Sequence, residues 1–128
     1  MSGYLLDTHT AIWFFNGSNT LSKTADSIIR DLYNPIYISI VSVWEIAIKI
    51  GIGKLEFNGK TAGFVRLAEK NEIIILPIKP DHITSLESLP LIHRDPFDRL
   101  LVAIAIDEQM SIISADKNIA QYNVPIIW

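Results

Sequence analysis

Apolar and polar positions alternate in blocks along the chain, and each block has the length of one secondary-structure element. Short runs of β-branched and other apolar residues predict strands at 4–6, 36–40, 73–76, 111–114 and 125–127. Longer apolar or amphipathic segments predict helices at 8–15, 22–33, 42–50, 61–70, 80–89 and 97–109. Because strands and helices alternate, the sequence predicts an α/β fold with a mainly parallel sheet of four to five strands and helices on both faces. We expect residues 1–128 to form a single domain.

Polar residues mark where several of these helices should begin. Ser22 is the expected N-cap of a helix that the Asn34-Pro35 pair should stop, and Ser42 with Glu45 forms a capping-box pattern. Asp95 before Pro96 predicts the N-cap and first residue of a helix that is apolar on every face. That helix should be buried on most sides. We expect residues 54–57 to be extended.

Four carboxylates stand at equivalent places in this pattern. Asp7 follows the first strand, Glu45 lies early in the helix after the second, and Asp98 lies in the first turn of the last long helix. Asp116 comes two residues after the fourth strand. In a parallel sheet the strand ends and the helix starts gather at the carboxyl edge, where open α/β sheets bind ligands. We therefore expect all four carboxylates at one edge.

Each acid also has an ordinary structural alternative. Asp7 could cap the helix that follows it, and Glu45 could complete its capping box and pair with Lys49. Asp98 could belong to a capping pattern with Asp95, and Asp116 could be a cap or turn residue. The functional hypothesis depends on the convergence of the four, because independent caps need not share an edge.

Electrostatics limits what such a group can be. Two carboxylates roughly 5 Å apart repel by about 3 kcal/mol at an effective dielectric constant of about 20. A group of four must protonate, spread apart or hold cations. An all-oxygen ligand set favours one or two Mg²⁺ or Mn²⁺ ions, which can activate water for phosphodiester cleavage.

Composition narrows the function classes further. The chain has no cysteine, which excludes disulfides, cysteine–zinc sites and thiol catalysis. Its net charge is −3 and shows no basic excess, so a nucleic-acid role needs another way to handle phosphate, of which bound divalent cations are one. No segment is long and uncharged enough to span a bilayer, and the N-terminal stretch is a poor signal peptide. We expect a cytoplasmic protein without membrane contact.

The chain resembles the PIN-domain superfamily, and more narrowly the VapC-like ribonuclease toxins of toxin–antitoxin pairs. The matching segments, in order, are Leu5-Leu6-Asp7-Thr8-His9, Ser42-Val43-Trp44-Glu45-Ile46-Ala47-Ile48-Lys49, Gly53-Lys54-Leu55, His93-Arg94-Asp95-Pro96-Phe97-Asp98-Arg99-Leu100-Leu101, Ser114-Ala115-Asp116 and 122–128. The third of these is no phosphate-binding loop, because it lies at a helix end and lacks the remaining spacing.

The resemblance implies a metal-dependent endoribonuclease in which a metal-activated water hydrolyses RNA. It also implies a homodimer and a cognate antitoxin that covers the acidic site with a basic side chain. Its catalytic and metal-binding residues would be Asp7, Glu45, Asp98 and Asp116, and its supporting residues would be Asp95, Thr8 and Ser42.

Two alternatives stay open at this point. The same acids could serve a DNA nuclease or a phosphatase, and a PIN domain can be a non-catalytic module that binds RNA or a partner. Among the remaining residues, His9 and His93 are interpreted as local hydrogen-bonding groups, and Arg99 could contact phosphate or pair with an acid. Lys49 and Lys54 could line an RNA groove. Trp13 and Trp44 are interpreted as core or interface residues.

Overall fold

A five-stranded sheet in which every pairing is parallel forms the centre of the computed structural model, which describes residues 3–128. The strand order is β3-β2-β1-β4-β5, with bounds β1 Tyr4–Leu6, β2 Ile36–Ser39, β3 Ile74–Leu76, β4 Ser111–Ile113 and β5 Ile126–Ile127. The predicted fold class is confirmed. The first two residues of the predicted domain lie outside the described residues.

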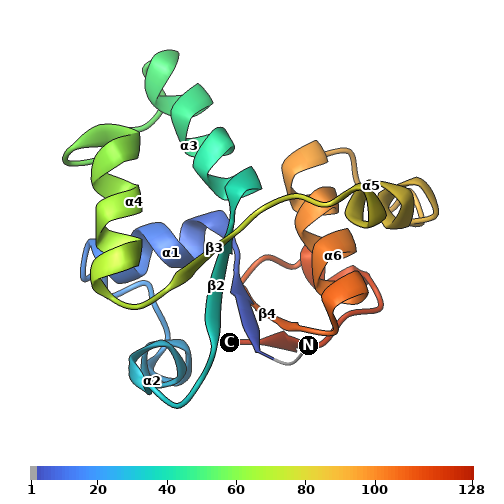
Figure 1. Cartoon of the computed structure of the whole chain (residues 1–128), viewed down its shortest axis with the longest axis horizontal. Coiled ribbons are helices and arrows are strands. Elements are labelled where there is room, and N and C mark those ends of the chain that lie inside the picture. The colour runs from blue at the N-terminus through green and yellow to red at the C-terminus, as the bar shows by residue number, and fades with distance from the viewer. Residues whose placement is uncertain (1–2) are drawn as a thin grey trace.

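Helices cover both faces of the sheet (Figure 1). Their bounds are α1 Thr8–Phe15, α2 Lys23–Arg30, α3 Ile40–Gly51, α4 Lys60–Lys70, α5 Pro80–Glu87 and α6 Pro96–Glu108, with a short 3₁₀ helix at Ile119–Gln121. Helices α1, α2 and α4 lie on one side of the sheet and α5 and α6 on the other. None of the helices in residues 3–128 combines the length and apolar character needed to cross a bilayer.

Alternation along the short strands divides the core between the two faces. Leu6 and Ile38 pack with α1, α2 and α4, whereas Leu5 and Tyr37 pack with α6. Successive strand side chains point to opposite faces, so neighbouring residues enter different cores. Helix α6 fills the second core, with Leu101 to Ala105 all buried, as its apolar sequence predicted.

Three local predictions were wrong. Helix α2 ends at Arg30 rather than at the Asn34-Pro35 pair, and Leu32 is 76% exposed instead of packing on its apolar face. Helix α3 begins at Ile40 with Ser39 as its N-cap, so Ser42 lies inside the helix and the strand before it ends at Ser39. Helix α5 ends at Glu87 rather than at Leu89. Residues 54–57 belong to neither a helix nor a strand, so their extended conformation stays a prediction.

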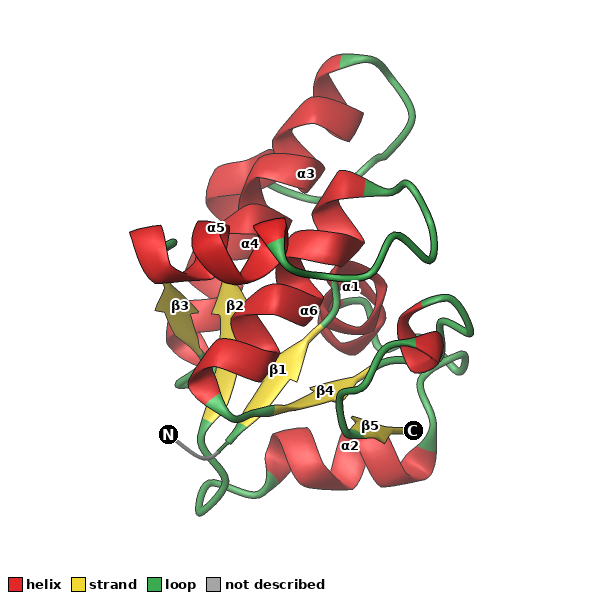
Figure 2. Ribbon diagram, turned by 90° about the vertical axis from the view of Figure 1, so that its right-hand side faces the viewer, coloured by secondary structure: helices red, strands yellow, loops and turns green. Residues whose placement is uncertain are grey.

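Register places the ends of the central strands beside one another. Leu6 pairs with Ile38 on one side and with Ile113 on the other. The arrowheads of β1 and β2 point the same way in Figure 2, toward α3. The residues that follow these strands, Asp7 and Ser114 among them, therefore meet at the carboxyl edge.

Candidate active site

Asp7 lies at the end of β1 and is 4% exposed. Its Oδ1 accepts a hydrogen bond from the backbone N–H of Thr10 at 2.8 Å, so it caps α1. Its Oδ2 accepts a hydrogen bond from the Ser114 hydroxyl, at the end of the neighbouring strand β4. The capping role and a place in the acidic site are therefore compatible.

Asp116 reaches the same place through Ser114. The Ser114 Oγ accepts the backbone N–H of Asp116 at 2.9 Å, while Asp116 Oδ1 accepts the N–H of Asn118 at 2.8 Å in a local turn. Asp7 and Asp116, together with His9 and Trp13, line a depression of about 260 Å³. Two of the four predicted carboxylates thus share a surface hollow and a bridging serine.

Glu45 lies in the second turn of α3, since the helix begins two residues before Ser42, and it is 3% exposed. Its Oε1 accepts a hydrogen bond from Thr8 Oγ1 at 2.7 Å, and Thr8 Oγ1 is also hydrogen-bonded to Ser42 Oγ at 2.9 Å. Its Oε2 accepts from Lys49 Nζ at 2.7 Å. The two predicted supporting hydroxyls therefore hold this carboxylate, and Lys49 neutralises it.

Asp98 lies one turn into α6, behind the N-cap Asp95, whose Oδ1 accepts the backbone N–H groups of Phe97 and Asp98. Burial, the neighbouring charge of Asp95 and the smaller effects of Asp116 and Glu45 raise the pKa of Asp98 to about 7. A hydrogen bond from His93 acts in the opposite direction. Asp98 therefore senses the negative charge of three other acids.

The acids are close enough to interact but are spread apart. Among residues 3–128, no three of the predicted carboxylates have ligand atoms that all lie within 4.8 Å of one another. Each of the four carboxylates has a hydrogen-bond partner of its own. Every buried side-chain nitrogen and oxygen in the described residues also has a hydrogen-bond partner. The spacing of the acids, the raised pKa of Asp98 and the Lys49 ammonium beside Glu45 together reduce the repulsion that the sequence predicted.

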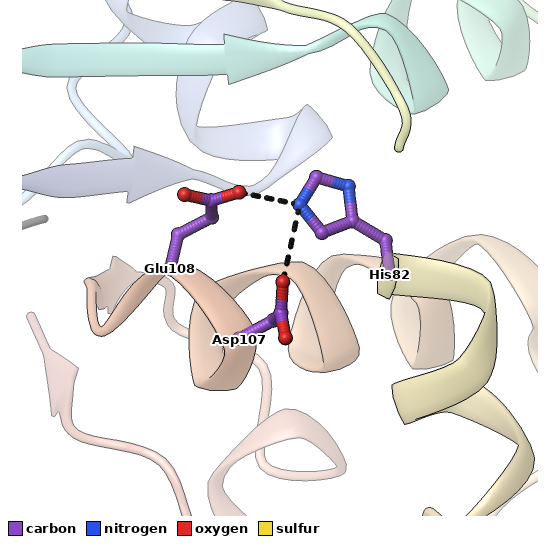
Figure 3. A group of neighbouring side chains, drawn as sticks. All are labelled: His82, Asp107 and Glu108. Carbon is purple, nitrogen blue, oxygen red and sulfur yellow. Dashed lines mark hydrogen bonds and ion pairs between the residues drawn. The ribbon is translucent and has the colours of Figure 1, made fainter. Parts of the chain in front are cut away.

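A tighter group lies between α5 and α6. His82 Nε2 is 2.7 Å from Glu108 Oε2 and 3.7 Å from Asp107 Oδ2, as Figure 3 shows. His82 is fully buried, and its hydrogen bond to Glu108, with the help of Lys79, lowers the pKa of that carboxyl.

The position of the imidazole proton in this group disfavours metal binding. The backbone N–H of Lys79 donates to His82 Nδ1 at 3.0 Å, which places the imidazole proton on Nε2. Metal binding through Nε2 would move that proton to Nδ1, against the Lys79 N–H. The Lys79 ammonium, 3.2 Å from Glu108, already supplies a cation. We conclude that this group joins the two helices.

Other residues differ from their sequence interpretations. Arg99 neither contacts an acid nor stands free for phosphate, because it donates to the carbonyls of Leu89 and Pro90 and to the Tyr122 hydroxyl. For Trp44, interpreted as a core or interface residue, an exposure of 56% rules out the core and leaves the interface interpretation open. Sequence reasoning missed Ser114 as a bridging residue. Its place directly after a strand, two residues before an acid, was the available signal.

Comparison with protein families gives a match over residues 4–125 to the PIN domain. The chain belongs to the PIN domain family. A comparison with curated proteins gives no match. The family match confirms the fold expected from the resemblance, and the PIN domain accounts for nearly the whole described chain.

Solved structures share this PIN fold at low sequence identity. VapBC2 from Rickettsia felis bound to a promoter DNA fragment matches with a TM-score of 0.74 and 14% identity, covering 100% of this chain and 99% of that one. A toxin–antitoxin complex from Klebsiella pneumoniae matches with a TM-score of 0.65 and 18% identity, covering 98% and 97%. VapBC-5 from Mycobacterium tuberculosis, of the VapBC family of toxin–antitoxin systems, matches at 0.61 and 19%, covering 98% and 97%.

Proposed function

We propose that residues 1–128 form a single PIN domain that acts as a metal-dependent endoribonuclease, the toxin of a toxin–antitoxin pair in the cytoplasm. The observation that carries this proposal is the group of acids at the carboxyl edge of the sheet. Burial and three acidic neighbours raise the pKa of Asp98 to about 7. Negative charge is therefore concentrated around a carboxyl that the fold does not require there, which is typical of a functional site.

The donor set suits a hard divalent cation. Asp7, Glu45, Asp98 and Asp116 offer carboxylate oxygens only, which Mg²⁺ and Mn²⁺ prefer. One or two bound divalent ions would supply a nucleophilic water and stabilise the leaving oxygen of a phosphodiester. Metal charge would also allow an acidic site to receive a polyanion.

The protein's own groups prepare the ligands. Thr8 and Ser42 fix Glu45, the Ser114 hydroxyl and the Thr10 N–H fix Asp7, and Asp95 caps the turn that carries Asp98. The Thr8 and Ser114 hydroxyls are engaged in orienting the carboxylates that we propose as metal ligands, which leaves a water as the nucleophile. We therefore propose hydrolysis without a covalent enzyme intermediate.

The cleavage test compares wild type with Asp7→Asn and with the distant control Glu87→Gln, all purified identically. Substrates are structured and unstructured RNA, DNA of the same sequence and a small phosphomonoester, each with and without Mn²⁺. We expect wild type and Glu87→Gln to cleave RNA only with metal, and Asp7→Asn to be inactive. Equal cleavage by all three proteins would indicate contaminating ribonuclease and remove support for the proposal.

Other outcomes separate the alternatives. Metal-dependent cleavage of DNA or of the phosphomonoester in preference to RNA would replace the ribonuclease proposal with a DNA nuclease or a phosphatase. Metal binding and RNA binding without cleavage of any substrate would favour a non-catalytic binding module.

The antitoxin proposal draws on the solved structures, two of which are described as toxin–antitoxin assemblies. We propose that a cognate antitoxin places a basic side chain among the acids. Purified antitoxin should abolish metal-dependent cleavage, and a variant lacking that basic residue should inhibit less while still binding. Full inhibition by that variant would contradict the proposal.

An exposed apolar stripe on α3 supports a homodimer. Ile40, Trp44, Ile48 and Ile52 follow one another at four-residue spacing and are 39%, 56%, 38% and 62% exposed. Such a row on a helix that already buries its opposite face is typical of an interface. Light scattering should report a dimer that Ile52→Glu weakens and the control Leu32→Glu does not. A monomeric wild type at micromolar concentration would contradict it.

A further inference from the structure

His93 connects a buried tyrosine to one of the site carboxylates. Its Nδ1 lies 2.9 Å from the Tyr122 hydroxyl oxygen, and its Nε2 lies 3.4 Å from Asp98 Oδ2. The ring centroids of His93 and Tyr122 are 5.4 Å apart. Tyr122 is 4% exposed, so one end of the connection is anchored in the core and the other reaches the acidic site.

The donors around Tyr122 fix the protons of the imidazole. Its hydroxyl oxygen accepts from an Arg99 guanidinium N–H at 3.1 Å and from the backbone N–H of His93 at 3.3 Å. Both groups are obligatory donors, and together they use the two lone pairs of the oxygen. The hydroxyl proton must then go to the remaining neighbour, His93 Nδ1. Nδ1 is therefore an acceptor, and the imidazole proton lies on Nε2.

This tautomer directs an N–H at Asp98. The Nε2–H points to Oδ2, while Oδ1 has no hydrogen-bond partner in residues 3–128. The 3.4 Å separation is long for such a bond, as is common in sites without their ligand. The two oxygens of one carboxylate are thus made unequal by the fold.

The far end of the connection is held firmly. Arg99 also donates to Pro90 O at 2.8 Å and to Leu89 O at 3.3 Å, which ties the loop before α6 to Tyr122. Arg99 and Asp98 are adjacent on α6. Arg99 therefore links the loop, the start of α6 and Tyr122, and His93 is hydrogen-bonded at both ring nitrogens within this group.

We propose that His93 is a positioning residue, which engages Asp98 Oδ2 through a proton that Tyr122 fixes on Nε2 and so leaves Oδ1 available to a divalent ion. The inference rests on the proposed function, because it assumes that Asp98 is a ligand. Partners of metal ligands commonly change metal affinity by about 10–100-fold when they are removed. His93 itself needs no contact with metal or RNA.

The first test examines the proton positions and does not depend on metal or activity. Long-range ¹H–¹⁵N spectra of the metal-free protein, with the His93 signals assigned by their absence in His93→Gln, distinguish the two tautomers. We expect the proton on Nε2 in wild type and a loss of that preference in Tyr122→Phe. A wild-type proton on Nδ1 would overturn the inference.

The second test measures Mn²⁺ affinity by electron paramagnetic resonance, with melting temperature recorded for each variant. We expect His93→Phe to weaken Mn²⁺ binding by about tenfold or more and to lower kcat for RNA with KM unchanged. His93→Gln should restore most of the affinity, because its amide N–H can reach the position of Nε2–H. If His93→Phe does not fold, Tyr122→Phe takes its place and should weaken binding in the same direction.

The Asp98→Asn variant separates the two proposals. If Asp98→Asn weakens Mn²⁺ binding while folded His93→Phe binds like wild type, the positioning role is wrong and the metal site stands. If Asp98→Asn binds Mn²⁺ like wild type, Asp98 is no ligand, and both the proposed metal site and the role of His93 in it are overturned.

Discussion

Thr8 Oγ1 donates a 2.7 Å hydrogen bond to Glu45 Oε1, which joins two residues that are 37 positions apart in the chain. Thr8 belongs to α1 and Glu45 to α3, so the bond couples the two helices that begin at the carboxyl edge. Both residues are buried. The same contact therefore stabilises the fold and orients a carboxylate of the acidic site.

Replacing Thr8 by the isosteric valine should destabilise the protein by about 1–3 kcal/mol, because a buried carboxylate oxygen loses its donor. Urea denaturation at neutral pH measures the change. The matched control is Thr20→Val at an exposed position, which should change the free energy of unfolding by less than about 0.5 kcal/mol. Equal, small effects of both substitutions would show that the Thr8–Glu45 bond contributes little.

The contribution of Asp98 to the stability of the metal-free protein should fall as pH rises toward neutrality. The pKa of Asp98 is raised to about 7 in the folded state from its ordinary value of 3.8, so the folded state binds the proton more tightly. The penalty for ionising Asp98 is absent below the unfolded pKa and is fully present above the folded one. Asp98→Asn removes this penalty, and with chelator present it should be more stable than wild type by about 2–4 kcal/mol at a pH of about 8.

Denaturation of both proteins at a pH of about 4 and a pH of about 8 checks the pH prediction. The difference in stability should be small at the lower pH and should grow as pH increases. Glu87→Gln removes a carboxyl that is not among the causes of the raised pKa of Asp98, so it should show no such trend. A constant difference between wild type and Asp98→Asn across this range would contradict the pKa assignment.

The His82–Glu108 group should behave as a structural contact and not as a metal site. Glu108→Gln should leave Mn²⁺ affinity unchanged, in contrast to Asp98→Asn. His82→Leu should lower the free energy of unfolding by about 1–3 kcal/mol, because Glu108 and the Lys79 N–H lose a buried partner. Titration with Mn²⁺ and urea denaturation measure the two effects. Weaker Mn²⁺ binding in Glu108→Gln would show that this group does hold a cation.

Gly63 should resist substitution although it lies within helix α4. A Cβ there would meet the backbone oxygen of Asn58 at 2.5 Å, so the helix cannot remain where it is. Gly63→Ala should destabilise by about 1–3 kcal/mol, against the usual gain of about 1 kcal/mol for alanine in a helix. Gly51→Ala in α3, where nothing lies within 4 Å, is the control and should be neutral or stabilising. Thermal unfolding of both variants tests the contrast.

The strands and the parallel sheet could be predicted because alternation and apolar runs are local properties. The start of α3 could not, because Ser39 and Ser42 are both competent N-caps. The choice is made by pairing in the sheet: Ser39 pairs with Leu76 as the last residue of β2, and the chain turns into the helix directly afterwards. The end of α2 is associated with a local contact instead, since the Asn34 side chain donates to Ile28 O at 3.0 Å and so caps a carbonyl of the last turn.

For the candidate site, the sequence predicted which acids share an edge but not how their charges are relieved. Strand ends and helix starts follow from the chain order, so Asp7, Asp98 and Asp116 could be assigned to one edge. The link from Tyr122 through His93 to Asp98 depends on side chains 29 and 5 positions apart that only the folded chain brings together. The role of Gly63 in close packing was hidden for the same reason.

The central place of β1 has a consequence for protein synthesis. Strand β1 is made first, yet one of its two neighbours, β4, is made more than a hundred residues later, and Asp7 depends on Ser114 beyond it. In a chain that has not yet reached β4, one edge of β1 has no partner strand. Such a chain also lacks Asp116 and the Ser114 hydroxyl that binds Asp7. The acidic site therefore assembles only after β4 and Ser114 have been made, and a shorter nascent chain lacks the completed site.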